Sequence, residues 1–248
     1  RRNYNIASLT VGASEAPAGL RYYRIDRLGG DAVGVLKALG SDLPVHVMGH
    51  DWGAAITWCL AITHPKMVRS AVAVSVGHPT EYARAGLEQK RKGLYTIGWQ
   101  FPVLAERWLV ANDWARMRHW LRQHPGPEAR PRRRPNGRAG RRPGLRRRPA
   151  PGPSRRTLAR TGGLTAGLNW YRANLRSMLL KSWPQCTVPM LGIWGSEDHC
   201  LAEDQMEHSG RRVSGPWHYE RIDGAGHWLP LEEPQRIANL AIDWFNRH

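Results

Sequence analysis

The residues best suited to chemistry lie at 49–53, which read GHDWG. The pattern G-x-nucleophile-x-G predicts a sharp turn from strand to helix that holds the central side chain exposed on a strained backbone. Asp51 occupies the nucleophile position, where Ser or Cys is usual. A carboxylate is already ionised at neutral pH, since its reference pKa is about 3.9, and it suits displacement at a saturated carbon. The alternative interpretation is a hydrogen-bonded Asp at a helix N-terminus.

An ester formed on Asp51 must be hydrolysed, which requires a base for water. His227 lies in the segment GAGHW at 224–228, after the last predicted strand. Loops at the carboxyl ends of strands carry ligand sites in open α/β sheets. Asp198, in WGSED at 194–198, follows the preceding strand and would orient the imidazole. The order nucleophile, acid, histidine is that of α/β-hydrolases. Glu197 and Asp223 are the alternatives for the acid.

The elements that must position these residues alternate along the chain. Short apolar runs predict buried strands at 45–48 and 70–76, and residues 188–194 and 217–222 also read as strands. Helical spacing predicts helices at 25–39, after the elbow up to His64-Pro65, and at 237–245. This alternation indicates an α/β fold built on a parallel sheet.

Three segments follow from this pattern. Residues 1–80 form the first part of the core with the nucleophile elbow, and residues 185–248 form its second part. Residues 81–184 read as a helical insertion that is rich in tryptophan.

The net charge of +17 is concentrated in one part of that insertion. Residues 126–160 hold 13 Arg and one Glu, and the remaining chain carries a net charge of +5. This Pro/Gly/Arg-rich stretch predicts a disordered loop, because it contains too little apolar surface to offset ordering entropy. It could instead be a nucleic-acid-binding segment or the product of GC-rich codons read out of frame.

Composition places further bounds on the class of protein. Three cysteines at 59, 186 and 200 form neither a disulfide framework nor a metal-ligand spacing. No apolar run could span a bilayer, and the N-terminus lacks the apolar region of a signal peptide. We therefore expect a soluble, cytoplasmic protein.

The three segments GHDWG, WGSED and GAGHW together resemble the epoxide hydrolases of the α/β-hydrolase fold and the related haloalkane dehalogenases. The resemblance implies a mostly parallel sheet flanked by helices, with the insertion as a helical cap. In epoxide hydrolases two cap tyrosines hold the epoxide oxygen. Tyr171, in LNWYRAN at 168–174, and Tyr95, in YTIGWQFP at 95–102, fall where these belong, although each could simply be packed in the cap. Trp52 fits both groups, because haloalkane dehalogenases place a halide-binding Trp after the nucleophile.

The resemblance implies an epoxide hydrolase without metal or organic cofactor. Asp51 would attack the epoxide, Tyr95 and Tyr171 would stabilise the alkoxide, and His227 with Asp198 would activate water. The backbone N–H of Trp52 would donate to the oxyanion, and a vicinal diol would leave. The cap aromatics suggest an apolar, aryl-bearing epoxide. Oligomeric state is not readable from the sequence.

Two departures from the family pattern matter. The Arg-rich stretch stands where the family has a cap helix. The family also carries an H-G-x-P oxyanion loop upstream of the elbow, whereas the His-Pro pairs here begin at residues 64, 78 and 124. We therefore expect a chain that lacks the first strands, and an inactive fragment or an Arg-rich nucleic-acid-binding protein are the alternatives from other classes.

Overall fold

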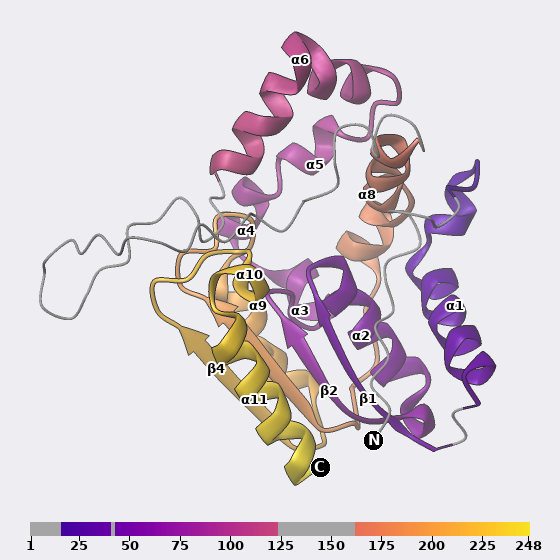
Figure 1. The fold of residues 1–248 in the computed structure, drawn as a ribbon, viewed down its shortest axis with the longest axis vertical. Helices are drawn as coiled ribbons and strands as arrows, with labels where there is room; N and C mark the ends of the chain where they lie inside the picture. The colour runs from indigo at the N-terminus through magenta and orange to yellow at the C-terminus, as the bar shows by residue number, and fades with distance from the viewer. Residues whose placement is uncertain (1–15, 41–42, 124–161) are drawn as a thin grey trace, which may run out of the picture.

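The computed structural model describes residues 16–40, 43–123 and 162–248, whose arrangement is shown in Figure 1. Residues 1–15 and the Arg-rich stretch lie outside the described residues. The predictions of a disordered loop and of missing first strands therefore stay predictions.

The described core is one parallel sheet of four strands in the order β1-β2-β3-β4. All four predicted strands are confirmed, and the bounds are β1 (Val45–His50), β2 (Val68–Val74), β3 (Met190–Gly195) and β4 (Trp217–Ile222). Because every neighbouring pair is parallel, the carboxyl ends of the strands share one edge of the sheet. That edge is where ligand sites occur in such sheets.

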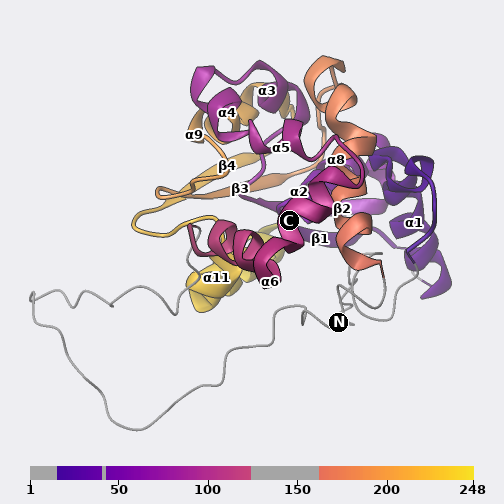
Figure 2. The same ribbon diagram turned by 90° about the horizontal axis from the view of Figure 1, so that it is seen from above.

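Helices cover both faces of this sheet, and side chains alternate between them along β2. Ala71 and Ala73 pack with α2 (Trp52–Thr63), whereas Val72 and Val74 pack with α11 (Pro234–Arg247). Figure 2 shows α2 and α11 on opposite sides of the strands. The remaining core helices are α1 (Ile25–Ala38), α9 (Glu203–Glu207), α10 (Leu229–Glu232), η1 (Leu20–Tyr23), η2 (Pro65–Met67) and η3 (His208–Arg212).

The described helices between β2 and β3 are joined by loops, and within the predicted insertion the described regular structure is helical, as predicted. These helices are α3 (Pro79–Arg84), α4 (Leu87–Lys92), α5 (Tyr95–Gly98), α6 (Leu104–Gln123) and α8 (Gly163–Leu180). Figure 1 shows α5, α6 and the upper part of α8 beyond the carboxyl ends of the strands. Residues 112–114 have positive φ and interrupt α6. No helix in the described ranges has the length and apolar character that crossing a membrane requires.

The expectation of a buried strand at 45–48 is wrong for β1. Its residues are only partly buried, and Met48 is 41% exposed. Within the described ranges β1 pairs with β2 alone, so it is an edge strand of the described sheet. An apolar run does not encode which neighbours a strand will have.

The two elbow glycines differ in what they accommodate. A Cβ on Gly49 would lie 2.1 Å from the carbonyl oxygen of Gly53, whereas a Cβ on Gly53 meets nothing within 4 Å. Close packing at the elbow therefore requires glycine at position 49, whereas position 53 has room for a Cβ.

We predict that Gly49→Ala destabilises the protein by roughly 3 kcal/mol or more, because backbone at the elbow must move. At this chain length that loss lowers the Tm by about 6–12 °C. Thermal unfolding followed by circular dichroism measures the change, with Gly53→Ala as the matched control. Equal Tm values for the two variants would contradict the assigned role of Gly49.

Candidate active site

Asp51 lies at the apex of the turn between β1 and α2. Its φ of 53° is strained for a non-glycine residue, as the sequence predicted. Backbone bonds secure this conformation, since the Asp51 N–H donates to Val74 O (3.2 Å) and the Ala54 N–H donates to Asp51 O (2.9 Å). The Asp51 side chain remains 37% exposed. The turn therefore presents a carboxylate that a small molecule can reach.

His227 reaches this carboxylate from the loop after β4. Its Nε2 lies 3.4 Å from Asp51 Oδ1, and its Nδ1 lies 2.9 Å from Asp198 Oδ2. The Asp198 side chain is fully buried, and its Oδ1 accepts the backbone N–H groups of Cys200 (2.8 Å) and Leu201 (2.9 Å). The structure thus brings the three predicted residues into one line of carboxylate, imidazole and carboxylate.

The rival acids lie elsewhere. Glu197 is exposed, and Asp223 forms an exposed ion pair with Arg221 two residues away. Only Asp198, among the three carboxylates considered from the sequence, is hydrogen-bonded to the His227 ring.

The His227 loop crosses the ends of the strands because Gly195 leaves room for it. A Cβ on Gly195 would lie 2.6 Å from the carbonyl oxygens of both Ala225 and Gly226. The Glu197 N–H also donates to Ala225 O at 2.8 Å. These contacts hold the His227 loop against the end of β3. The loop therefore runs from β4 back toward β1.

Side chains then fix His227 itself. Its carbonyl oxygen accepts from His50 Nε2 (2.7 Å) and Ser75 Oγ (3.3 Å). The carboxylate of Glu232 accepts the backbone N–H groups of Gly226 (2.8 Å) and Trp228 (3.2 Å), which flank His227. Burial and the neighbouring His227 lower the pKa of His50, so its ring is neutral and can act as this donor.

No sequence pattern predicted a role for His50, Ser75 or Glu232. A signal existed only for His50, which directly precedes the nucleophile. Ser75 and Glu232 form hydrogen bonds to the backbone of His227 and Gly226, and no sequence pattern indicates these contacts.

Charge pairing sets the protonation of the site. Burial alone would raise the pKa of Asp51, but the hydrogen bond and charge of His227 lower it to about 2. Burial would lower the pKa of His227, but the hydrogen bonds and charges of Asp198 and Asp51 raise it to about 10. At neutral pH the free site therefore holds an imidazolium between two carboxylates. The backbone N–H of Trp52 also contributes to the lowered pKa of Asp51, because it lies close to the carboxylate.

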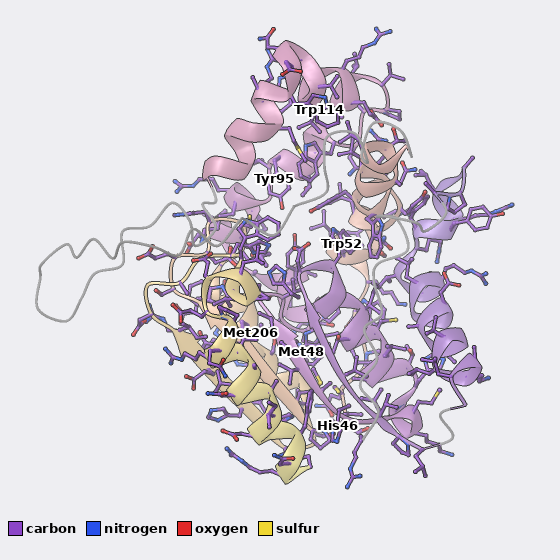
Figure 3. The ribbon with its side chains drawn as sticks, in the orientation of Figure 1. His46, Met48, Trp52, Tyr95, Trp114 and Met206 are labelled. Carbon is purple, nitrogen blue, oxygen red and sulfur yellow. The ribbon has the colours of Figure 1, made fainter. Side chains whose placement is uncertain are left out.

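The two predicted tyrosines lie together on the cap side of the site. The Tyr171 ring lies 6.2 Å from the Tyr95 ring and packs edge-on against Trp52 at 5.1 Å, centroid to centroid. Burial and the charge of Asp51 raise the pKa of Tyr171 well above its usual value, and burial raises that of Tyr95 likewise. Figure 3 shows Tyr95 coming from the cap and Trp52 from the core side. Both phenols therefore stay protonated and can donate hydrogen bonds.

Arg172 anchors the helix that carries Tyr171. Its guanidinium forms a two-pronged ion pair with Glu106 (2.8 and 2.9 Å) and donates from Nε to Trp99 O (2.9 Å). The Arg172 side chain is 4% exposed, so this pair is shielded from solvent. Such bidentate pairs fix orientation as well as position. They fix α8 against α6 directly beside Tyr171.

One group of side chains in the described ranges has donor atoms close enough for a metal. Atoms of Asp198, Cys200 and His227 lie within 4.8 Å of one another. However, the His227 Nδ1 is engaged by Asp198, and burial raises the pKa of the Cys200 thiol, which keeps it protonated. We interpret the group as the acid–histidine pair with a neighbouring thiol.

Comparisons with known proteins show the family to which the chain belongs. A family model described as the alpha/beta hydrolase fold matches residues 9–234. Epoxide hydrolase A of Mycobacterium tuberculosis is 30% identical over 255 residues, which cover 94% of this chain and 78% of the relative. The chain belongs to the epoxide hydrolases of the α/β-hydrolase fold. The predicted family and fold class are thereby confirmed.

Two further members of this fold extend over most of the chain. The AB hydrolase superfamily protein YfhM of Bacillus subtilis is 28% identical, covering 98% of this chain and 78% of the relative. The crystal structure of Epoxide Hydrolase A from Mycobacterium thermoresistibile superposes with a TM-score of 0.67 at 26% identity. That match covers 96% of this chain and 80% of the other.

We predict that Asp51→Asn lowers the pKa of His227 by at least about one unit, because it removes one of two opposing charges beside the ring. An NMR titration of the His227 ring measures the shift against the wild type. His50→Asn is the comparison variant, since it leaves both carboxylates in place. An unchanged pKa in Asp51→Asn would show that the two groups do not interact.

Proposed function

We propose that this protein hydrolyses an apolar epoxide to a vicinal diol through an ester on Asp51. One observation carries the proposal: the carboxylate of Asp51 lies 3.4 Å from an imidazole that a buried Asp198 orients. The names of the relatives support the same substrate class. We further propose that residues 1–80 and 185–248 form the core and residues 81–184 the cap.

In the first step, Asp51 attacks a ring carbon of the epoxide. A bond forms between its carboxylate oxygen and that carbon, and the electron pair of the broken C–O bond passes to the epoxide oxygen. Tyr95 and Tyr171 are protonated and close together, so they can hydrogen-bond this oxygen and supply a proton as charge develops. Donors aimed at developing charge in a site of low polarity are strongly stabilising.

Ester formation also converts His227 into a base. The ester carries no charge, so the hydrogen bond and charge of Asp51 no longer raise the pKa of His227. The proton that His227 then releases restores, through solvent, the proton that the tyrosine pair gave to the epoxide oxygen. The neutral ring is thereby ready to accept a proton from water, and Asp198 still orients it.

In the second step, water attacks the carbonyl carbon of the ester and its proton passes to His227. The Trp52 N–H, which lies close to the Asp51 carboxylate in the free site, can donate to the tetrahedral oxyanion. Collapse of that intermediate breaks the bond between the carbonyl carbon and the ester oxygen, so Asp51 is regenerated with one oxygen from water and the diol keeps one oxygen from Asp51. The leaving oxygen takes the proton from His227, and the diol is complete.

The aromatic surroundings favour an apolar substituent on the epoxide. The rings of Trp52, Trp99 and Tyr95 all pack on or near Tyr171. Such surfaces bind apolar and aryl groups by burial and stacking. The three cysteines are free and buried, which suits the reducing cytoplasm that we propose as its location.

We predict that His227→Gln traps the ester on Asp51, because attack on the epoxide does not require the base whereas hydrolysis does. Intact-protein mass spectrometry after mixing with styrene oxide should show an adduct of one substrate mass. Peptide mapping should place the adduct on Asp51, and the double variant Asp51→Ala/His227→Gln should show none.

An adduct on another residue, or an equal adduct in the double variant, would refute Asp51 as the nucleophile. A wild-type enzyme that releases halide from a haloalkane and forms no diol from styrene oxide would favour the dehalogenase alternative.

A further inference from the structure

Cap helix α4 contacts the loop that carries Asp198. We call residues 198–202 the acid loop. Gln89 and Lys92 lie three positions apart on α4, so their side chains lie on one face of the helix. That face meets the acid loop, and we call the pair the acid-loop clamp.

Lys92 uses its full hydrogen-bonding capacity in this contact. Its ammonium group donates to Asp198 O (2.8 Å) and Leu201 O (2.9 Å). It also pairs with Glu88 at 2.8 Å, one turn earlier on the helix. An ammonium group has three donors, and these three acceptors account for all of them. The side chain is only 18% exposed, so the contact is largely shielded from water.

Gln89 bonds two further residues of the acid loop. Its Oε1 accepts the Ala202 N–H (2.9 Å), and its Nε2 donates to Cys200 O (3.5 Å). Gln89 is 4% exposed, and both ends of its amide are paired. The clamp therefore makes four side-chain-to-backbone hydrogen bonds within five residues of the acid loop.

The same turn of backbone orients the catalytic acid. Asp198 Oδ1 accepts the N–H groups of Cys200 and Leu201, which leaves Oδ2 directed at His227. The clamp holds the carbonyl groups of these same residues. A shift of the acid loop would therefore turn the carboxylate relative to the imidazole.

We propose that Gln89 and Lys92 are positioning residues that fix Asp198 for hydrolysis of the ester and couple the acid to the cap. This inference rests on the proposed function. Coupling follows from the chain itself, because Tyr95 begins α5 only three residues after Lys92. The turn between them is tight, since the Gly93 N–H donates to Gln89 O (2.8 Å) and the Thr96 N–H donates to Gly93 O (2.9 Å). The segment from α4 to the start of α5 thus positions both an alkoxide donor and the acid.

The test is steady-state kinetics of Lys92→Met on styrene oxide. Removal of the clamp should slow ester hydrolysis and leave ester formation almost intact. We expect kcat to fall about tenfold or more, the size typical of lost supporting contacts. The KM should fall in proportion, and kcat/KM should stay within about threefold, because kcat/KM reports only steps up to ester formation. Gln89→Leu should act in the same direction, and rapid-quench mass spectrometry should detect accumulated ester in both variants.

Two control variants separate positioning from general damage. Lys90→Met removes an equal charge from an exposed position on the same helix and should leave kcat and KM unchanged. Asp204→Asn weakens the other anchor of α4, the bond from the Gly86 N–H to Asp204 Oδ2 (3.0 Å), without touching the acid loop. It should lower the Tm without accumulating ester. The inference is wrong if Lys92→Met lowers kcat with an unchanged KM, or if Asp204→Asn gives the same kinetic pattern.

A second measurement does not depend on turnover. The titratable groups around His227 are Asp51, His50, Asp198, Cys200 and Glu232. A misplaced Asp198 would lower the pKa of His227 in Lys92→Met, whereas loss of a positive charge alone would raise it. An NMR titration that finds a raised or unchanged pKa overturns the inference. If the pKa falls but the wild type forms no diol, the clamp stands and the proposed function fails.

Discussion

The structure depends on one contact between an imidazole and a carboxylate. The two groups follow the first and last strands of the described sheet order and meet at the carboxyl ends of the strands. Asp51 follows β1 and His227 follows β4, yet their side chains lie 3.4 Å apart. A positive φ at Asp51 lifts the carboxylate off the strand end, and Gly195 lets the histidine loop pass close over β3. His50 and Glu232 then hold that loop from both sides. The parallel sheet brings the carboxyl ends of its strands to one edge, and these few contacts position the catalytic side chains there.

The electrostatics follow from this single contact. Asp51 holds a proton on His227 while it is a free carboxylate, and an ester at the same position would release that hold. A buried charge needs a partner, so the second carboxylate keeps the ring oriented after the first is neutralised. The pair of Asp51 and His227 therefore keeps the nucleophile ionised before attack. After the ester has formed, the same pair leaves His227 as a neutral base. The cap completes the site through protonated phenols above it and through α4, which bonds the acid loop.

The sequence predicted the parts of this arrangement that have local patterns. Asp51, Asp198 and His227 each follow an apolar strand in a glycine-bearing segment, and parallel strands bring such segments to one edge. Lys92, Gln89 and Glu232 escaped notice because they bond backbone groups distant in sequence, and any residue offers a backbone group. The partial exposure of β1 was missed for a related reason, since pairing between strands is a long-range property. Tyr95 and Tyr171 were found through family resemblance rather than through spacing.

The origin of the oxygen added to the diol tests the central role of Asp51 most directly. The enzyme in excess over a styrene oxide substrate is allowed one turnover in water enriched in oxygen-18. If Asp51 attacks the ring carbon, the first diol carries an unlabelled oxygen taken from the carboxylate, and the label appears in the peptide containing Asp51. If water attacks the epoxide directly, the first diol carries the label and the peptide does not, which would contradict the account.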